Sequence, residues 1–223
     1  MVKRQWVILC LMMVGLWQPR AHAVIVINEV LADPPSVGGD ANSDGAVSTT
    51  RDEFIELLNV GSADVSLAGW SLSDEAQIRH LFAPQALIPG GGFFVVFGGG
   101  TPQGFSHVAV ASSGGLSLNN SGDQVALRDA QAVLIDSFVY GAEGGRDASL
   151  TRSPDATGDF IRHSEVSPLA FSPGRTIDGL LRLPSEESEP PGTHQQPALP
   201  EPSSLLLLGT GLVGIVSRRK LLK

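Results

Sequence analysis

Short runs in which apolar and polar residues alternate recur along residues 24–175, and turns rich in Gly, Pro and Asn separate them. Because successive side chains of a strand point to opposite faces, this period of two predicts β-strands. No stretch of this range carries the 3.6-residue period of an amphipathic helix. The predicted strands lie at 24–31, 78–82, 93–97, 107–111, 116–118, 124–129, 133–140, 148–152 and 160–166, and within a hairpin at 53–74.

The hairpin at 53–74 is the stretch around which we expect the fold to be organised. Ile55 and Leu57 fall on one face of its first strand, and the residues that flank them fall on the other. In the second strand the apolar pattern slips by one residue beside Gly69, which predicts a bulge that turns Trp70 inward. Since Trp70 is the only Trp between the two termini, we expect it at the centre of the core.

The number and spacing of these strands predict the fold class. Eight to ten short strands, about ten residues apart in a chain rich in Gly, are typical of an all-β, antiparallel sandwich. Residues 36–52 interrupt the strands with a polar, Gly-rich loop. A loop of this length without secondary structure is usually either functional or disordered.

The N-terminus predicts export. Residues 1–23 combine a basic start, an apolar run at 6–17 and the small-residue pattern at 21–23, which together are typical of a cleaved secretory signal peptide. The one cysteine, Cys10, lies inside this segment, so the mature chain would contain none. Disulfides, a thiolate nucleophile and a cysteine metal site are thereby excluded for the mature chain.

The C-terminus predicts a spacer and a membrane segment. Residues 177–199 are rich in Pro, Glu and Ser, a composition that predicts a disordered spacer. The apolar run at 205–216 predicts a single transmembrane helix over 203–217, short against the roughly 20 residues that span a bilayer comfortably. The basic residues that follow fit the positive-inside tendency, with the domain outside the cytoplasm.

The net charge is more negative when the two ends of the chain are left out. Residues 24–202 contain 23 acidic residues and 8 Arg without any Lys, a formal net charge of −15 against −8 for the whole chain. Such a surface repels phosphate backbones, so we expect no nucleic-acid partner. It favours solubility and divalent cations, and a plain solvated acidic exterior is the alternative interpretation.

Residues 40–45 read Asp-Ala-Asn-Ser-Asp-Gly, the opening pattern of a calcium loop. Oxygens at alternate positions can turn toward one hard cation, and the glycine permits a sharp bend. The twelfth position, which supplies a bidentate acid in an EF-hand, is Arg51, so one of the next two residues would complete the shell. The candidate Ca²⁺ ligands are Asp40, Asn42, Asp44, the Ala46 carbonyl, Ser48, Asp52 and Glu53. The alternative is an ordinary solvated turn, which uses the same residue types.

The last 24 residues resemble the PEP-CTERM sorting signal of exported bacterial proteins. Pro200, Glu201 and Pro202 come first, the apolar run follows, and a basic end closes residues 200–223. The resemblance implies that an exosortase, a membrane cysteine protease-transferase, recognises and cleaves the tail. It also implies a Gram-negative-type envelope, anchoring in the inner membrane before processing, and delivery to the cell surface or an exopolysaccharide matrix.

Residues 24–176 resemble the lamin-tail domain, an immunoglobulin-like sandwich found in nuclear lamins and in many exported bacterial proteins. The matching segments are 27–30, 53–59, 65–74, 88–91, 118–123, 127–129, 136–141 and 172–174. The family's recurring Trp after the last strands is absent, and Phe160 is its nearest substitute. The resemblance implies a binding or scaffolding module and names no ligand.

Three functions remain open at this point. The first is a non-enzymatic surface or matrix protein whose domain binds a polysaccharide or another surface protein. The second is an accessory or degenerate member of the exported hydrolases that carry this domain, although the four His outside the signal peptide are scattered and no G-x-S-x-G elbow is present. The third is a membrane-anchored structural protein without a specific ligand.

Overall fold

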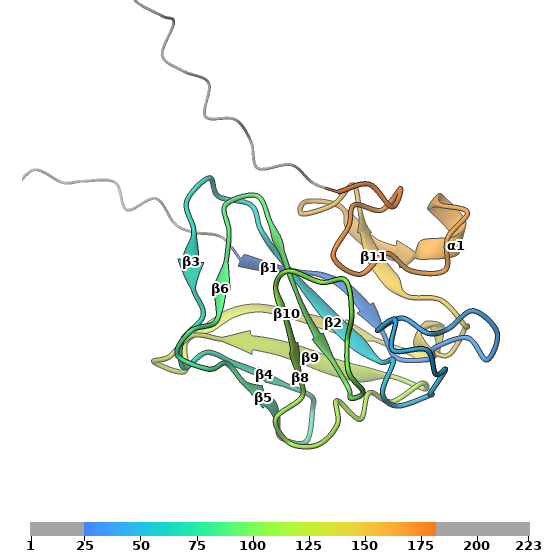
Figure 1. Ribbon diagram of the computed structural model, residues 1–223, viewed down its shortest axis with the longest axis horizontal. Coiled ribbons are helices and arrows are strands. Elements are labelled where there is room, and N and C mark those ends of the chain that lie inside the picture. Colours follow the sequence, from blue (N-terminus) through green and yellow to red (C-terminus); the bar gives the residue numbers. More distant parts are fainter. Residues whose placement is uncertain (1–24, 182–223) are drawn as a thin grey trace, which may run out of the picture. The chain divides into compact units, whose positions relative to one another are not determined.

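The computed structural model describes residues 25–181, and within this range almost all regular structure is β-strand (Figure 1). A 3₁₀ turn (η1, Ala142–Gly144) and a four-residue helix (α1, His163–Val166) are the helical elements described. The prediction of a chain that is almost entirely β-sheet, as in an immunoglobulin-like sandwich, is therefore confirmed.

Six strands form the larger sheet, whose order is β12-β11-β1-β2-β7-β8. Their bounds are β12 Asp159–Arg162, β11 Leu150–Ser153, β1 Ile25–Leu31, β2 Phe54–Asn59, β7 Phe93–Phe97 and β8 Val108–Val110. All neighbours are antiparallel except β7 and β8, which run parallel. The prediction of a purely antiparallel sandwich is wrong at this edge, because the loop 98–107 carries the chain back before β8 begins.

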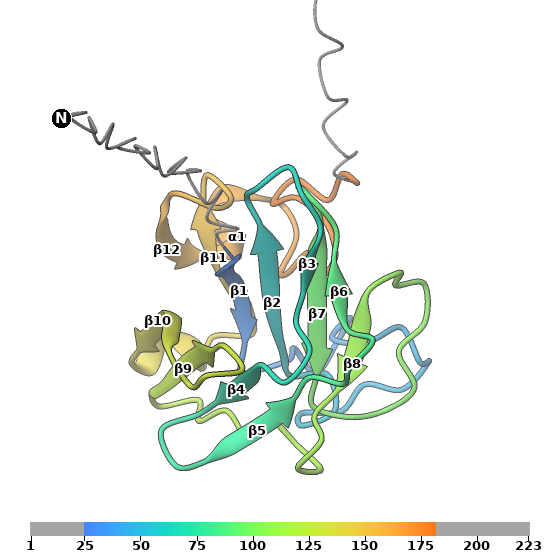
Figure 2. The same ribbon diagram turned by 90° about the vertical axis from the view of Figure 1, so that its left-hand side faces the viewer.

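Four strands form the second sheet, whose order is β10-β9-β4-β5, and two more form a small separate ladder. The bounds are β10 Leu134–Tyr140, β9 Asp123–Arg128, β4 Ser71–Ser73 and β5 Ile78–Leu81, with β3 Val65–Ser66 paired to β6 Leu87–Ile88. Figure 2 shows the two larger sheets as separate layers. The predicted strand at 116–118 is absent from the described structure, since the Leu118 N–H donates to a carboxylate instead of a ladder partner.

The predicted hairpin at 53–74 does not form. Both edges of β2 are already occupied, by β1 on one side and β7 on the other, so β3 pairs with β6 instead. The turn after β2 is nevertheless built as the sequence predicts. The Asn59 side chain accepts a hydrogen bond from the Gly61 N–H at 2.9 Å and donates to the Ala63 carbonyl at 2.8 Å.

Trp70 lies at the edge of the core and not at its centre. It is half-buried, and it packs against the main cluster beside a turn in which its N–H donates to the Leu67 carbonyl. Gly69 adopts a positive φ of +75° in that turn, so the slip of the apolar pattern marks the change from one sheet to another. Leu67 is the residue that this turn buries completely.

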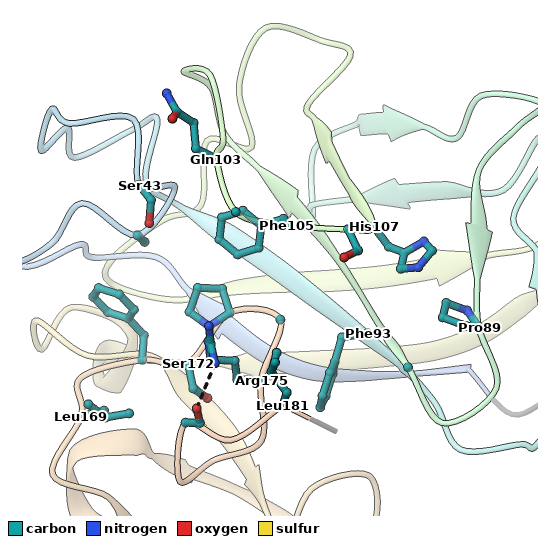
Figure 3. Close-up of a pocket in the computed structure, with 18 of the residues that line it drawn as sticks. Ser43, Pro89, Phe93, Gln103, Phe105, His107, Leu169, Ser172, Arg175 and Leu181 are labelled. Atoms are coloured by element: carbon teal, nitrogen blue, oxygen red, sulfur yellow. Dashed lines mark hydrogen bonds between the residues drawn. The ribbon is translucent and has the colours of Figure 1, made fainter. Parts of the chain in front are cut away.

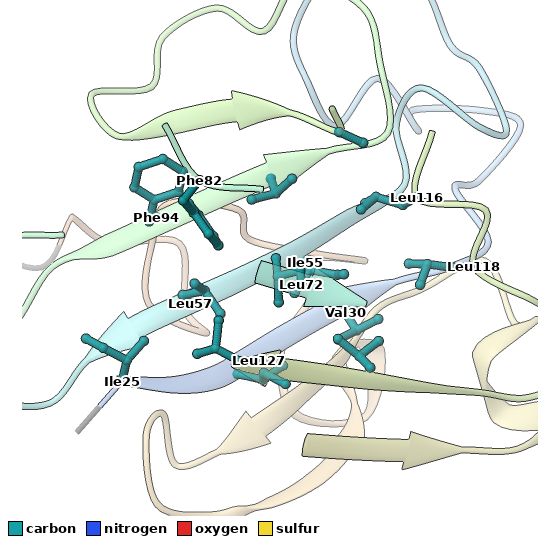
Figure 4. Close-up of a cluster of buried hydrophobic side chains, with 14 of the residues drawn as sticks. Ile25, Val30, Ile55, Leu57, Leu72, Phe82, Phe94, Leu116, Leu118 and Leu127 are labelled. Carbon is teal, nitrogen blue, oxygen red and sulfur yellow. The ribbon is translucent and has the colours of Figure 1, made fainter. Parts of the chain in front are cut away.

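The main core fills the space between the two larger sheets (Figure 4). Ile55 and Leu57 of β2 enter it from the six-stranded sheet, as predicted, and Leu72 and Leu127 enter it from the four-stranded sheet. On β9 the alternating residues Val125 and Leu127 are both fully buried in this core.

The outer face of the six-stranded sheet, which points away from the second sheet, is buried as well. Its apolar residues Leu31, Phe54, Val95 and Phe97 form a second cluster with Phe171 from the C-terminal segment. We call residues 167–181 the strap, because this segment lies against the outer face. Burial on both faces explains why β7 reads as the continuous apolar run that the sequence pattern identified.

Residues 25–181 contain no helix that is both long and apolar enough to cross a membrane. The predicted signal peptide (1–23), the transmembrane helix (203–217), the sorting segment (200–223) and most of the spacer (177–199) lie outside the described residues.

We predict that Leu57→Ala lowers the free energy of unfolding by about 3 kcal/mol, because Leu57 is 0% exposed between the two sheets and truncation leaves a cavity. Val139→Ala is the control, because the Val139 side chain is 67% exposed. It should change the free energy of unfolding by less than about 0.5 kcal/mol. Chemical denaturation of both variants measures the difference. Equal effects would contradict the core described above.

Candidate functional site

An open groove of about 700 Å³ lies between the strap and the segments that flank β7 (Figure 3). The strap supplies one side with Leu169, Ser172 and Arg175, and the other side carries Phe105 and His107. Residues of the loop 36–52 reach the groove as well. Because this concave groove combines aromatic rings with polar side chains, it is the candidate binding site.

Aromatic rings form the floor and sides of this groove. Phe105 packs edge-on against Phe97 with ring centroids 5.0 Å apart, and Phe171 packs edge-on against Phe54 at 6.3 Å. Phe54 and Phe97 themselves meet at 5.7 Å. The chain of edge-to-face contacts fixes Phe105 and Phe171, both half-buried, at the border of the groove.

Few charges line the groove, although the chain as a whole is acidic. Arg175 is exposed, and its guanidinium contacts only the Gly179 carbonyl, at 3.4 Å, among the residues described. Asp40 is the one carboxylate in the lining, and both of its oxygens accept backbone N–H groups, from Asp44 and Gly45. The groove can therefore offer hydrogen-bond donors and apolar rings to a ligand without strong repulsion of anions.

Buried and half-buried carboxylates hold the strap against the sheet. The Ser172 N–H donates to Glu29 at 2.9 Å, and the Gly174 N–H donates to Glu56 at 2.6 Å. The Ile177 N–H donates to Asp155 at 3.1 Å. The strap is thus positioned by its backbone, and it places its side chains along the groove.

Glu29 and Glu56 are directly opposite each other on β1 and β2, and both are 0% exposed. Burial raises the pKa of Glu29, while the nearby His163 opposes the rise. Burial raises the pKa of Glu56 well above its usual value, and Glu29 adds to that rise. Two like charges in adjacent buried positions repel each other, so the charge of either carboxylate raises the pKa of the other.

Sequence reasoning did not single out this pair. The signal was available in the two segments, INEVL and FIELL, because each places one acidic residue among the apolar residues of a strand. An ionisable residue buried on a strand requires partners, and here the backbone donors come from residues more than a hundred positions later.

The candidate calcium residues of the loop 36–52 are drawn into one hydrogen-bonded network. Asp44 accepts the N–H groups of Ala46 and Thr101 on its two carboxylate oxygens, and its own N–H donates to Asn42 and Asp40. The Asn42 side chain donates to the Gly99 carbonyl at 3.2 Å. The loop is therefore a folded element that carries Asp40 to the groove.

Asp52 closes this loop from its far end. Its carboxylate accepts the Asn42 N–H at 3.1 Å and the Ser48 N–H at 2.7 Å, and the Ser48 hydroxyl accepts the Arg51 N–H. Burial raises the pKa of Asp52, and the charges of Asp40 and Asp44 add to the rise. A bound cation would relieve this repulsion.

Glu53 lies apart from the other candidate ligands. Its carboxylate accepts the Leu118 N–H at 3.3 Å, and burial raises its pKa to about 7. Among residues 25–181 no three acidic, histidine or cysteine side chains are close enough together to hold a metal ion. Calcium binding by the loop therefore stays a prediction from its sequence.

Comparison with known families agrees with this architecture. A family model of the lamin tail domain matches residues 18–142, which is more than half of the chain, so the chain belongs to the lamin tail domain family. A model of the PEP-CTERM protein-sorting motif matches residues 198–220. No curated protein matches the chain.

The folded unit extends beyond the matched residues. The match ends at residue 142, yet β11 pairs with β1 and the strap donates hydrogen bonds to β1 and β2. Residues 148–181 therefore complete the larger sheet and form one side of the groove.

We predict that Ca²⁺ titrated into the purified chain gives a measurable heat of binding and raises the melting temperature. Asp40→Asn should abolish both effects, because a neutral amide is a weaker ligand for a hard cation. Asp129→Asn is the matched control, since Asp129 also caps the N–H groups of a turn, far from the loop in sequence. Absence of heat and of any thermal shift in the unmodified chain would refute a calcium site.

Proposed function

We propose that this chain is a non-enzymatic protein of the cell surface or extracellular matrix of a Gram-negative-type bacterium, exported by an N-terminal signal peptide. The PEP-CTERM motif implies processing by an exosortase, and motifs of this type mark exported proteins. The lamin tail domain then acts as the binding or scaffolding part. The single observation that carries the proposal is the combination of one such domain with a sorting motif in the same chain.

The arrangement that most resembles a catalytic centre supports a non-enzymatic role. Ser172 Oγ lies 3.0 Å from His163 Nε2, the separation of a nucleophile and its base. However, His163 is fully buried, its Nδ1 faces the Leu169 carbonyl instead of a carboxylate, and Ser172 also donates to Glu29. Such contacts suit a structural network, whereas a hydrolase requires a nucleophile that a substrate can reach.

The groove favours an extended glycan as the ligand. Sugar rings present apolar C–H faces that pack on aromatic side chains, and hydroxyl groups that bond to polar ones. Phe105 and Phe171 offer the aromatic surface, and Gln103, His107 and Arg175 offer polar groups along the same groove. A surface-protein ligand is the alternative.

Processing can be tested in the source cells by replacing Pro200, Glu201 and Pro202 with Ala. We expect the variant to accumulate in the membrane with residues 203–223 intact, whereas the unmodified protein loses them, as mass spectrometry of both would show. The matched control replaces Glu189, Pro190 and Pro191, which have the same residue types in the spacer. An unmodified protein that retains its tail would refute processing.

Ligand binding can be tested with a glycan array and the purified chain. Phe105→Ala removes an aromatic face of the groove and should weaken binding to any retained glycan by about tenfold, or 1.4 kcal/mol. Val139→Ala, an exposed apolar residue outside the groove lining, should leave binding unchanged. Binding that Phe105→Ala does not affect would place the site elsewhere, and capture of a protein with no glycan retained would favour the alternative ligand.

A further inference from the structure

Glu29, Ser172 and His163 form a buried hydrogen-bonded relay beneath the strap. Ser172 Oγ lies 3.0 Å from Glu29 Oε2 and 3.0 Å from His163 Nε2. Glu29 and His163 are 0% exposed and Ser172 is almost completely buried, so no solvent hydrogen bond replaces these contacts. The relay connects β1 to α1 through the strap.

The protonation of His163 is fixed on one side of its ring. His163 Nδ1 lies 3.0 Å from the Leu169 carbonyl oxygen, which can only accept a hydrogen bond. Nδ1 therefore carries a hydrogen. The remaining question is where hydrogens lie in the two contacts that Ser172 Oγ makes.

Counting hydrogens in those two contacts shows that the relay holds an extra proton. Each contact requires one hydrogen, and the Ser172 hydroxyl supplies one. The second must be on Glu29 Oε2 or on His163 Nε2. Glu29 Oε1 already accepts from the Ser149 hydroxyl and the Ser172 N–H, so it is not an alternative place for this proton.

The surroundings of the relay favour retention of that proton. β2 places the Glu56 carboxylate next to Glu29, and the turn after β11 adds Asp155, which accepts hydrogen bonds from Asn28 and Ile177. β11 and β7 contribute only Thr151 and Val95 in the same row, and the exposed Arg175 belongs to the strap. Burial raises the pKa of both glutamates.

We propose that Glu29 holds this buried proton and thereby fastens the strap to the sheet, and that loss of the proton releases the strap and removes one side of the groove. Without the proton, one hydroxyl hydrogen faces two acceptors, and the Glu29 and Glu56 carboxylates carry adjacent buried charges with Asp155 nearby. The device does not rest on the identity of the groove's ligand. Release of the strap would make the shape of the groove depend on pH. It would have the same effect on the end of the strap, from which the chain continues toward residues 198–220.

The direction of the pH dependence follows from the glutamate pKa values, which are higher in the folded protein than the ordinary 4.5. The protonated pair therefore contributes its full stability below about pH 4.5, and this contribution is lost as pH rises through the raised pKa values. The strap should thus be held most tightly in mildly acidic solution and opened toward alkaline pH.

Glu29→Gln provides the decisive variant. Its amide oxygen can accept from Ser149 and Ser172 as Oε1 does, and its amide N–H can donate to Ser172 Oγ in place of the proton. The variant satisfies the relay permanently and removes the charge opposite Glu56. We expect it to hold the strap at every pH at which the domain is folded.

The test follows amide hydrogen exchange at Ser172 and Gly174 in the full-length chain between about pH 5 and pH 9, as protection factors normalised for intrinsic exchange. As the pH rises, the protection factors of Ser172 and Gly174 in the unmodified chain should fall at least about tenfold relative to those of Leu57 and Val96 in the core strands. In Glu29→Gln they should stay within about twofold. The control Glu165→Gln, at an exposed position of α1, should behave like the unmodified chain.

Three results would overturn the proposal. The first is a set of protection factors in the unmodified chain that do not change with pH. The second is a fall in Glu29→Gln equal to that in the unmodified chain. The third comes from carboxyl ¹³C chemical shifts of the unmodified chain, which do not depend on any variant folding: the proposal requires Glu29 or Glu56 to titrate above the ordinary range, and two ordinary titrations would refute it.

Discussion

The larger sheet carries two glutamates side by side on a face that the fold buries, and much of the structure follows from the need to satisfy them. A buried carboxylate left without partners costs several kcal/mol. Side chains supply part of what they need, since Asn28 of β1 donates to Glu56 and the Ser149 hydroxyl donates to Glu29. The strap supplies the backbone donors, through the Ser172 and Gly174 N–H groups.

Closure of the strap over the glutamates also creates the groove. The backbone bonds that satisfy Glu29 and Glu56 bring Phe171 onto Phe54, which extends the second apolar cluster. Leu169, Arg175 and Leu181 of the strap then line the same groove as Phe105 and His107. The same segment therefore bonds to the polar network and lines the binding surface. A change in the protonation of the network would thus change the position of one side of the groove.

Local patterns predict the strands of this protein well, because the alternation of side chains is a local property. The runs at 93–97, 124–129 and 133–140 correspond closely to β7, β9 and β10. Pairing is a long-range property, and there the pattern failed: nothing in residues 53–74 indicates that β2 is enclosed by β1 and β7. For the same reason Trp70 was placed too deep, since its position depends on which sheet receives β4.

In the candidate site, too, local features could be predicted from the sequence and long-range contacts could not. The turn chemistry of residues 40–52 was readable in the sequence, and these residues do form a folded loop beside the groove. Glu53 was grouped with them on proximity in sequence alone, whereas its carboxylate accepts a hydrogen bond from the Leu118 N–H. The partners that Glu29 and Glu56 find in the strap lie 143 and 118 residues away, which no local pattern can reveal.

The strap is an integral part of the domain because it satisfies the buried glutamates. The most direct measurement compares the free energy of unfolding of two chains, one comprising residues 24–181 and one ending after residue 166. The shorter chain lacks three N–H donors to buried or half-buried carboxylates together with the Phe171 ring, so it should be less stable by at least about 3 kcal/mol. Equal stability of the two chains, within about 0.5 kcal/mol, would contradict the account.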